Sequence, residues 1–293
     1  MEGAAAGTLP DNKLTEKAIE VLRRPRGAPL FLAVGYYKPH TRWVCPKTYF
    51  DLYRPADMAL PTNFAPRPTV PPGVPAAAVH PTNADLFRNV DVTPDMARTA
   101  IAAYFACVSY IDAQVGRLIA EVNRLQLRNR TVIVFVSDHG YHLGERGRWS
   151  KHYSLYDLVG RVPLIIDAPG TTGRGRSSPR VVALVDLFPT LVQLAGLPPV
   201  AGLQGTSLVP LLQDPSAPRN RPAYSQSAKG TSLAAGRSVR TERWRYTEWD
   251  AGRAGAELYN HQSDSKELRN LAQHPDYAAV VTHHRNLLRN GPF

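Results

Sequence analysis

The sequence predicts an α/β fold with a mostly parallel sheet flanked by helices, followed by a smaller antiparallel sheet. Short apolar runs rich in β-branched residues alternate with segments of helical period, as in proteins whose helices cover a buried parallel sheet. After Pro222 apolar and polar residues alternate at period two, which is typical of antiparallel strands. We therefore place a boundary within residues 215–222, between an α/β domain (1–218) and a small sheet-and-helix subdomain (219–293).

The first elements alternate helix and strand. Residues 11–24 carry apolar side chains at helical spacing, and Arg23 and Arg24 suit the negative end of a helix dipole. Prolines 25 and 29 end this helix. The apolar run 30–34 then predicts a buried strand.

A proline-rich segment and a long helix come next. Residues 41–95 lack periodicity, which indicates either a lid or substrate wall or a disordered loop. Residues 94–125 predict a helix packed on the sheet, and Cys107 on it is expected to be a buried small hydrophobe. The predicted apolar stripe consists of Ile101, Tyr104, Phe105, Val108, Ile111, Val115, Leu118, Ile119, Val122 and Leu125.

The run 132–136 predicts the central strand, buried on both faces, because four of its five apolar residues are β-branched. Further elements follow in the order strand, helix, apolar turn, four strands and helix. Their predicted ranges are 162–167, 181–195, 208–212, 224–226, 236–241, 244–249, 257–260 and 275–288, and in 181–195 a short strand or turn leads into the helix.

Composition narrows the class of protein without deciding it. The chain of 293 residues has a formal net charge of +11, which attracts polyanions. Its basic residues are scattered, without the aromatic-interleaved patch of a nucleic-acid binder, so we expect no nucleic-acid partner. A sulfated or phosphorylated small substrate or an anionic polysaccharide fits the charge equally well. An arginine-rich composition also follows simply from a GC-rich coding sequence. We expect no membrane span, and no signal peptide is visible, so localisation stays unknown.

Polar side chains follow two of the predicted strands directly. Asp138, His139 and Gly140 follow residues 132–136, and Lys38 and His40 follow residues 30–34. Carboxyl ends of parallel strands share one edge of a sheet, where ligands bind. A turn without chemistry explains Asp-His-Gly equally well. The ionisable residues that crowd the same loop favour a functional site: His142, Glu145, Arg146, Arg148, Lys151 and His152.

Several segments, in family order, together resemble a sulfatase of the alkaline phosphatase superfamily, with the iduronate-2-sulfatase-like enzymes as the nearest subgroup. The segments are 35–40, 104–112, 137–140, 143–145 and 185–191, and the tail 238–249, 257–260 and 269–271 resembles the C-terminal subdomain of bacterial members. The resemblance implies an alkaline-phosphatase-like sheet, hydrolysis of a sulfate ester of a carbohydrate or similar alcohol, and a C-terminal antiparallel subdomain. Family members are typically periplasmic, secreted or lysosomal.

The resemblance also implies a set of site residues. A divalent metal ion, usually Ca²⁺, holds the sulfate in this family against a formylglycine made from cysteine or serine. Asp138 and His139 are the implied metal ligands, and His40 and Lys151 are the implied catalytic residues, with His40 at the sulfate or leaving-group oxygen and Lys151 at the sulfate oxygens.

Two further residues, Lys38 and His142, are the candidates for substrate binding. Lys38 is also consistent with a solvent-exposed side chain at the edge of its loop that has no role in the site. His142 and Glu145 are also candidates for residues that support the metal ligands without binding the metal themselves.

The sequence departs from the family pattern at the nucleophile. Neither Cys45-Pro-Lys-Thr nor Cys107-Val-Ser-Tyr fits the Cys-x-Pro-x-Arg motif, and no Asp-Asp pair occurs. We therefore expect the C-terminal portion of a longer enzyme, inactive by itself, whose partners are a sulfate-ester substrate and an N-terminal half that carries the formylglycine. A phosphoesterase or phosphonate hydrolase of the same superfamily and a non-catalytic binding protein for anionic glycans are the alternatives.

Overall fold

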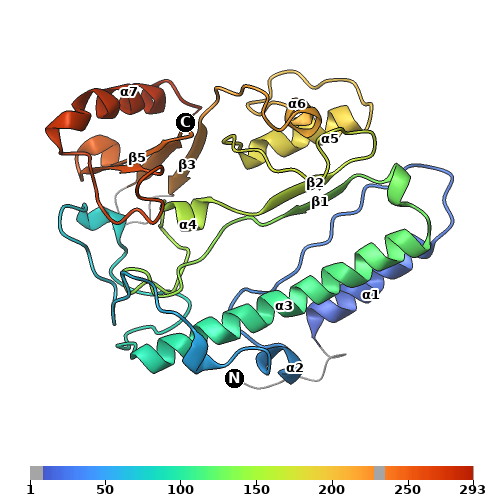
Figure 1. Cartoon of the computed structure of the whole chain (residues 1–293), viewed down its shortest axis with the longest axis horizontal. Helices are drawn as coiled ribbons and strands as arrows, with labels where there is room; N and C mark the ends of the chain where they lie inside the picture. The colour runs from blue at the N-terminus through green and yellow to red at the C-terminus, as the bar shows by residue number, and fades with distance from the viewer. Residues whose placement is uncertain (1–8, 228–234, 293) are drawn as a thin grey trace. The chain divides into compact units, whose positions relative to one another are not determined.

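The computed structural model describes residues 9–227 and 235–292 (Figure 1). It contains α-helices, short 3₁₀ helices and two antiparallel sheets, one with strands β1–β2 and one with strands in the order β3–β4–β5–β6. The chain divides into two compact units. Unit 1 comprises residues 1–67, 83–131 and 143–149, and unit 2 comprises residues 68–82, 132–142 and 150–293. The domain boundary at 215–222 stays a prediction.

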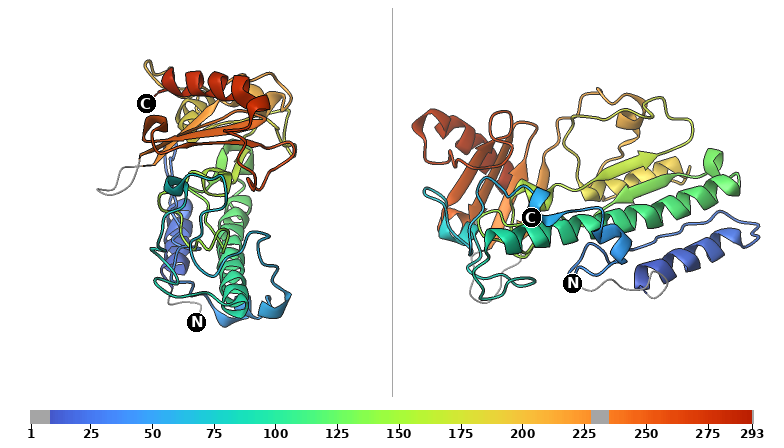
Figure 2. Two further views of the ribbon diagram at one scale, coloured as in Figure 1. Left: turned by 90° about the vertical axis from the view of Figure 1, so that its left-hand side faces the viewer. Right: turned by 60° about the horizontal axis from the view of Figure 1, so that its bottom comes forward.

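Unit 1 is built on two long helices, α1 (Pro10–Arg23) and α3 (Pro94–Arg124), which lie side by side (Figures 1 and 2). Both helices were predicted to within a few residues. Arg23 Nε donates to Glu121 Oε1 over 2.8 Å and ties the two helices together. Two short helices, α2 (Lys47–Phe50) and the 3₁₀ helix η1 (Pro55–Asp57), also pack on α3.

The buried face of α3 consists largely of small side chains. Thr93 caps its N-terminus by accepting a hydrogen bond from the Met96 N–H over 3.2 Å. Cys107 is fully buried, as predicted. Phe105 and Val108 are exposed, however, so that part of the predicted stripe is wrong. The difference has a physical reason, because alanines at helical spacing form a flat face that lets the neighbouring helices approach closely. These alanines are Ala97, Ala100, Ala103 and Ala106.

The run 30–34 forms no strand and has no strand partner among the described residues. Phe31 is 82 % exposed. The prediction of a buried strand at 30–34 is therefore wrong. A short apolar run shows that a segment can form a strand, but burial depends on neighbours from elsewhere in the chain.

Unit 2 begins with a two-stranded ribbon of β1 (Ile133–Val136) and β2 (Leu164–Asp167). The strands are antiparallel, with Ile133 opposite Asp167. Phe135 and Val136 are exposed, so β1 is not buried on both faces as predicted. The described strand pairs of both sheets are antiparallel, and parallel pairing is not observed among them.

The second part of unit 2 is the four-stranded sheet, which confirms the predicted C-terminal antiparallel sheet. Its strands are β3 (Ala223–Ser227), β4 (Gly236–Arg240), β5 (Trp244–Trp249) and β6 (Ala256–Asn260). Helix α7 (Ala278–Arg289) covers one face (Figure 1). The core between them consists of Val239, Tyr246, Leu258, Leu271, Val281 and Leu288.

Shorter helices connect these elements. They are α4 (Asp157–Gly160), α5 (Leu187–Leu194), α6 (Val209–Gln213) and the 3₁₀ helices η2 (Ala76–Ala78), η3 (Arg128–Arg130), η4 (Leu184–Asp186), η5 (Asp250–Gly252) and η6 (Pro275–Tyr277). None of the helices in residues 9–227 and 235–292 combines the length and the apolar character that crossing a membrane requires.

Candidate functional site

The loop that follows β1 brings Asp138 and His139 together. His139 Nδ1 lies 2.8 Å from the Gly140 carbonyl oxygen, and because a carbonyl only accepts, Nδ1 is the protonated nitrogen. The lone pair is therefore on Nε2, which lies 3.6 Å from Asp138 Oδ2. A backbone carbonyl that fixes the tautomer in this way is common for histidines that bind metals.

This pair fits one edge of a cation site. Two ligand atoms about 2.4 Å from one ion and at a right angle to each other are about 3.4 Å apart, close to the separation of Nε2 and Oδ2. The Asp138 side chain is 85 % exposed and therefore accessible. Across residues 9–227 and 235–292, no group of three or more histidine, cysteine or acidic side chains is placed to hold a metal ion. The pair would therefore supply only part of a coordination sphere.

The loop is held by its own backbone and by α4. Ser137 Oγ donates to the His139 carbonyl over 2.9 Å, and the Gly140 N–H donates to the Val159 carbonyl over 2.8 Å. A Cβ at Gly140 would lie only 2.0 Å from the Leu158 carbonyl oxygen. Glycine is therefore required here because the backbone of α4 occupies the space of a side chain.

Lys151 and His142 lie near each other in sequence but differ in burial. Lys151 is half-buried at the start of a turn in which the Ser154 N–H donates to its carbonyl over 3.3 Å. His142 is 1 % exposed, and its Nε2 lies 2.8 Å from Ser154 Oγ. Its ring contacts Tyr156 edge-on at a centroid distance of 6.1 Å. This burial favours a supporting role for His142 in the turn after Lys151.

The other two predicted residues, His40 and Lys38, lie in unit 1. His40 is exposed, and its Nδ1 lies 2.7 Å from the Thr41 carbonyl, so this histidine is also protonated on Nδ1. Lys38 Nζ donates to the carbonyls of His40, over 3.2 Å, and Arg42. Burial lowers the pKa of Lys38. Lys38 thus ties together the backbone around His40.

Helix α1 anchors this loop through its polar face. Asp11 Oδ1 accepts the Tyr37 N–H over 2.6 Å, and Thr15 Oγ1 lies 3.0 Å from the Tyr36 hydroxyl. Asp11 and Thr15 are both buried, at 2 % and 0 % exposure. These two residues were not predicted, because the apolar positions of α1 were expected to form its inner face. Their signal was the spacing of four residues, which puts both side chains on one side of the helix.

Two other features, Glu145 and a cleft, lie in unit 1. Glu145, in unit 1, accepts the Leu143 N–H over 2.7 Å and so stabilises its own loop. A cleft of about 500 Å³ in unit 1 is lined by residues of α2, η1 and α3, and the lining includes neither Lys38 nor His40. We therefore do not assign it to the candidate site.

Comparison with known proteins identifies the family. Residues 5–197 match the family model described as sulfatase, and residues 144–291 match the model described as N-sulphoglucosamine sulphohydrolase, C-terminal. The chain therefore belongs to the sulfatase family.

Individual relatives agree with this assignment. Iduronate 2-sulfatase of Homo sapiens is 36 % identical over 315 residues, covering 83 % of this chain and 56 % of that protein. The chain thus spans about half the length of the curated relatives it matches.

Solved structures confirm the fold. A structure in complex with its substrate D-glucosamine-2-N,6-O-disulfate aligns with a TM-score of 0.79 at 20 % identity, covering 96 % of this chain and 68 % of that one. A phosphonate monoester hydrolase of Agrobacterium radiobacter aligns with a TM-score of 0.79 at 26 % identity, covering 98 % and 61 %. The expected sulfatase fold of the alkaline phosphatase superfamily is confirmed.

Proposed function

We propose that this chain supplies cation-binding and sulfate-binding residues for the hydrolysis of a sulfate ester of a carbohydrate. The observation that carries the proposal is the fixed tautomer of His139, whose Nε2 and the neighbouring Asp138 carboxylate are 3.6 Å apart at the end of β1. Membership of the sulfatase family supports the reaction class. The name of the human relative and the sulfated glucosamine in a structural neighbour support a carbohydrate substrate.

In this proposal Asp138 and His139 would hold a divalent cation, with Ca²⁺ as the expected ion. The bound ion would neutralise negative charge on the sulfate group. Asp138 is the stronger ligand for a hard cation, since calcium prefers oxygen. His139 is oriented by the Gly140 carbonyl so that Nε2 is available.

The remaining residues act on the sulfate and the leaving group. The Lys151 ammonium would bind sulfate oxygens and stabilise charge that develops in the transition state. His40 would donate a proton to the leaving alkoxide, for which an imidazole is suited near neutral pH. Lys38 would hold the backbone around His40, as its contacts to two carbonyls indicate.

We further propose that the chain alone does not turn over sulfate esters. Neither Cys45 nor Cys107 lies in the Cys-x-Pro-x-Arg motif from which a formylglycine would be made. Both thiols are fully buried, which keeps them from acting as exposed nucleophiles.

Calorimetric titration of the purified chain with Ca²⁺ tests the cation site. We expect binding that Asp138→Ala abolishes and that Asp276→Ala, a change at an exposed aspartate of the same unit, leaves intact. Equal Ca²⁺ affinity in wild type and Asp138→Ala would refute the assignment. In parallel, release of nitrophenol from 4-nitrophenyl sulfate by the chain alone, lost in Asp138→Ala, would refute the proposed inactivity.

A phosphonate or phosphate ester is the second candidate substrate class. Two solved phosphonate monoester hydrolases are 26 % identical to this chain, with TM-scores of 0.79 and 0.77. Titration of the calcium-loaded chain with inorganic sulfate and with methylphosphonate separates the two classes. Tighter binding of sulfate supports the sulfatase assignment, and tighter binding of methylphosphonate supports the alternative.

A further inference from the structure

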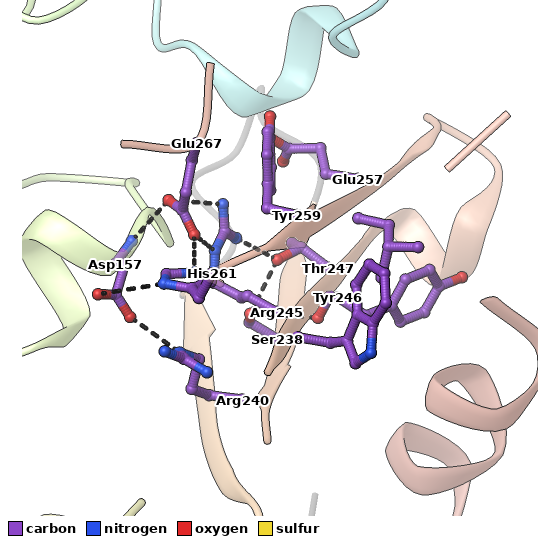
Figure 3. Close-up of polar contacts among 12 residues, drawn as sticks. Asp157, Ser238, Arg240, Arg245, Tyr246, Thr247, Glu257, Tyr259, His261 and Glu267 are labelled. Atoms are coloured by element: carbon purple, nitrogen blue, oxygen red, sulfur yellow. Dashed lines mark hydrogen bonds and ion pairs between the residues drawn. The ribbon is translucent and has the colours of Figure 1, made fainter. Parts of the chain in front are cut away.

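A buried charge cluster joins the four-stranded sheet to α4 within unit 2 (Figure 3). We define it as Arg240, Arg245, His261, Glu267 and Asp157, which come from β4, β5, the segment after β6 and α4. The side chains of Arg245 and Glu267 are 3 % and 2 % exposed, and Arg245 Nη2 donates to Glu267 Oε2 over 3.1 Å. His261 Nε2 lies 2.9 Å from Glu267 Oε1.

The period-two pattern of β5 explains why charges are buried here. Tyr246 contributes to the core beneath α7, so Arg245 and Thr247 lie on the opposite face of the sheet. Arg245 is paired in register with Arg240 of β4 and with Tyr259 of β6. Its guanidinium lies 4.9 Å from the centroid of the Tyr259 ring, and Nη1 donates to Thr247 Oγ1 over 2.5 Å. Aromatic and polar side chains therefore enclose the charge on this face.

Buried ion pairs are a costly way to stabilise a fold, because removing charges from water offsets most of their attraction. This cluster, however, also binds α4. Glu267 Oε2 accepts the Asp157 N–H over 2.9 Å, and Arg240 Nε donates to Asp157 Oδ1 over 3.2 Å. His261 Nδ1 lies 3.9 Å from Asp157 Oδ2. Charged groups of the cluster thus fix both the backbone and the side chain of Asp157, the first residue of α4.

Helix α4 in turn contacts the candidate cation site. The Val159 carbonyl accepts the Gly140 N–H over 2.8 Å, and the Leu158 carbonyl occupies the place of a Gly140 side chain. The next residue back along the chain is His139, whose Nδ1 donates to the Gly140 carbonyl. An unbroken series of contacts therefore runs from Glu267 through α4 to His139.

We propose that Arg245 and Glu267 are positioning residues for the Asp138–His139 pair: they hold α4, and α4 holds the loop that carries the pair. The inference rests on the proposed function of this pair as cation ligands. The C-terminal sheet thereby helps to position the loop that carries Asp138 and His139, through residues that do not contact the cation or the substrate.

Glu267 stays ionised across the neutral range, as this role requires. Burial acts to raise its pKa, but the charge of Arg245 and the hydrogen bonds from His261 and Arg245 outweigh burial and lower the pKa to about 2. The carboxylate is therefore available as an acceptor for the Asp157 N–H at every pH at which the protein is expected to function.

Amide hydrogen exchange on the full chain, without metal or substrate, tests the proposal. In Glu267→Gln we expect exchange in residues 138–142 at least about tenfold faster than in wild type, because the loop loses its support. The matched control is Glu248→Gln, which removes a carboxylate that accepts from Arg285 over 2.9 Å on the α7 side of the same sheet. This control is expected to leave residues 138–142 unchanged.

A spectroscopic readout separates positioning from general loosening. The ¹⁵N resonances of the His139 imidazole report the Nδ1–H tautomer, and we expect them to shift toward a mixture of tautomers in Glu267→Gln but not in Glu248→Gln. Should Glu267→Gln not fold, Glu267→Asp, which keeps the charge but shortens the side chain that reaches the Asp157 N–H, decides the question by the same two measurements, with an increase in exchange of about threefold.

Unchanged exchange at residues 138–142 together with an unchanged His139 tautomer, in the folded variant, would overturn the proposal. Faster exchange confined to residues 236–271 would overturn it as well, because the cluster would then stabilise only its own sheet. Both readouts are independent of Ca²⁺ binding by the wild-type chain. Failure of the proposed function therefore shows in the calorimetric titration, and failure of this inference shows in exchange.

Discussion

Gly140 and Gly160 lie close together in unit 2, but only Gly140 has another backbone in the space of a side chain. We expect Gly140→Ala to destabilise the protein by about 1–3 kcal/mol, since a Cβ 2.0 Å from the Leu158 carbonyl forces the loop and α4 apart. Gly160→Ala is the matched control, because nothing lies within 4 Å of its Cβ position. Urea unfolding of both variants measures the difference, and equal midpoints would contradict the packing described here.

Glu267 also links stability to pH. Its pKa falls from the usual 4.5 to about 2 in the folded protein, so the folded state favours the ionised form. The resulting stability is complete above the unfolded pKa and is lost as the pH falls from about 5 toward 2. We expect a loss of the order of 2–3 kcal/mol in the free energy of unfolding over this range.

Acid unfolding of Glu267→Gln isolates this contribution. The variant should be less stable than wild type at neutral pH, and the two unfolding free energies should converge near pH 2. Glu121 in unit 1 also has a pKa lowered to about 2, by hydrogen bonds from Arg124 and Arg23. Acid unfolding of Glu121→Gln therefore provides a comparison with that of Glu267→Gln. Parallel curves for wild type and Glu267→Gln would show that the carboxylate does not titrate as expected.

At the scale of elements, α1 serves as a support for the loop around His40. Asp11 of α1 is buried and accepts the Tyr37 N–H. We expect Asp11→Ala to cost about 1–3 kcal/mol, because it leaves this N–H without its acceptor. Asp11→Asn keeps an oxygen at the same position and should lose less. Chemical unfolding measures the loss of stability, and amide exchange at residues 36–43 measures the loosening of the loop. Equal losses in Asp11→Ala and Asp11→Asn would contradict the role of Asp11 as an acceptor.

The helices were predictable because their signals are local. Pro94 after Thr93 marks the start of α3, and the helical period of the following residues continues to its end. The strands of the C-terminal sheet were predictable for the same reason, since the alternation in 244–249 is visible in the sequence alone. Partners and burial were not predictable for 30–34 and 132–136, because they depend on which distant segments pack against each run.

The candidate site was predictable only in part. Asp138 and His139 are adjacent in sequence, so their proximity needed no structure. The charge cluster was missed because Glu267 and His261 lie in an irregular segment after β6, without a period that would place them. One signal was present: Arg245 lies in a strand between the aromatic residues Trp244 and Tyr246, and a buried charge in that position needs a partner.

At the scale of the whole molecule, a net charge of +11 is combined with exposed apolar side chains. In unit 2 these include Phe135 of β1, Ile165 of β2 at 61 % exposure, and Phe188 of α5 at 54 %. Like charges keep copies apart at low salt, and added salt screens this repulsion. We therefore expect self-association of the chain to rise with salt concentration.

Sedimentation velocity at low and high salt measures this association. Ile165→Thr should weaken it, because the change removes apolar surface from the ribbon while keeping a β-branched residue. Leu268→Thr, at a side chain that is 46 % exposed in the segment after β6, is the control and should have a smaller effect. A chain that stays monomeric at all salt concentrations would contradict the expectation.

The burial of charge on one side of β5 and of hydrocarbon on the other has a consequence for how the chain reaches its fold. A slip of one position between β4, β5 and β6 would turn Arg245 toward Leu258 and Val281 and would expose Tyr246 to the carboxylates. A slip of this kind costs much more free energy in a sheet with one charged and one apolar face than in a sheet whose two faces are alike. The alternation therefore discriminates against wrong alignments of these strands.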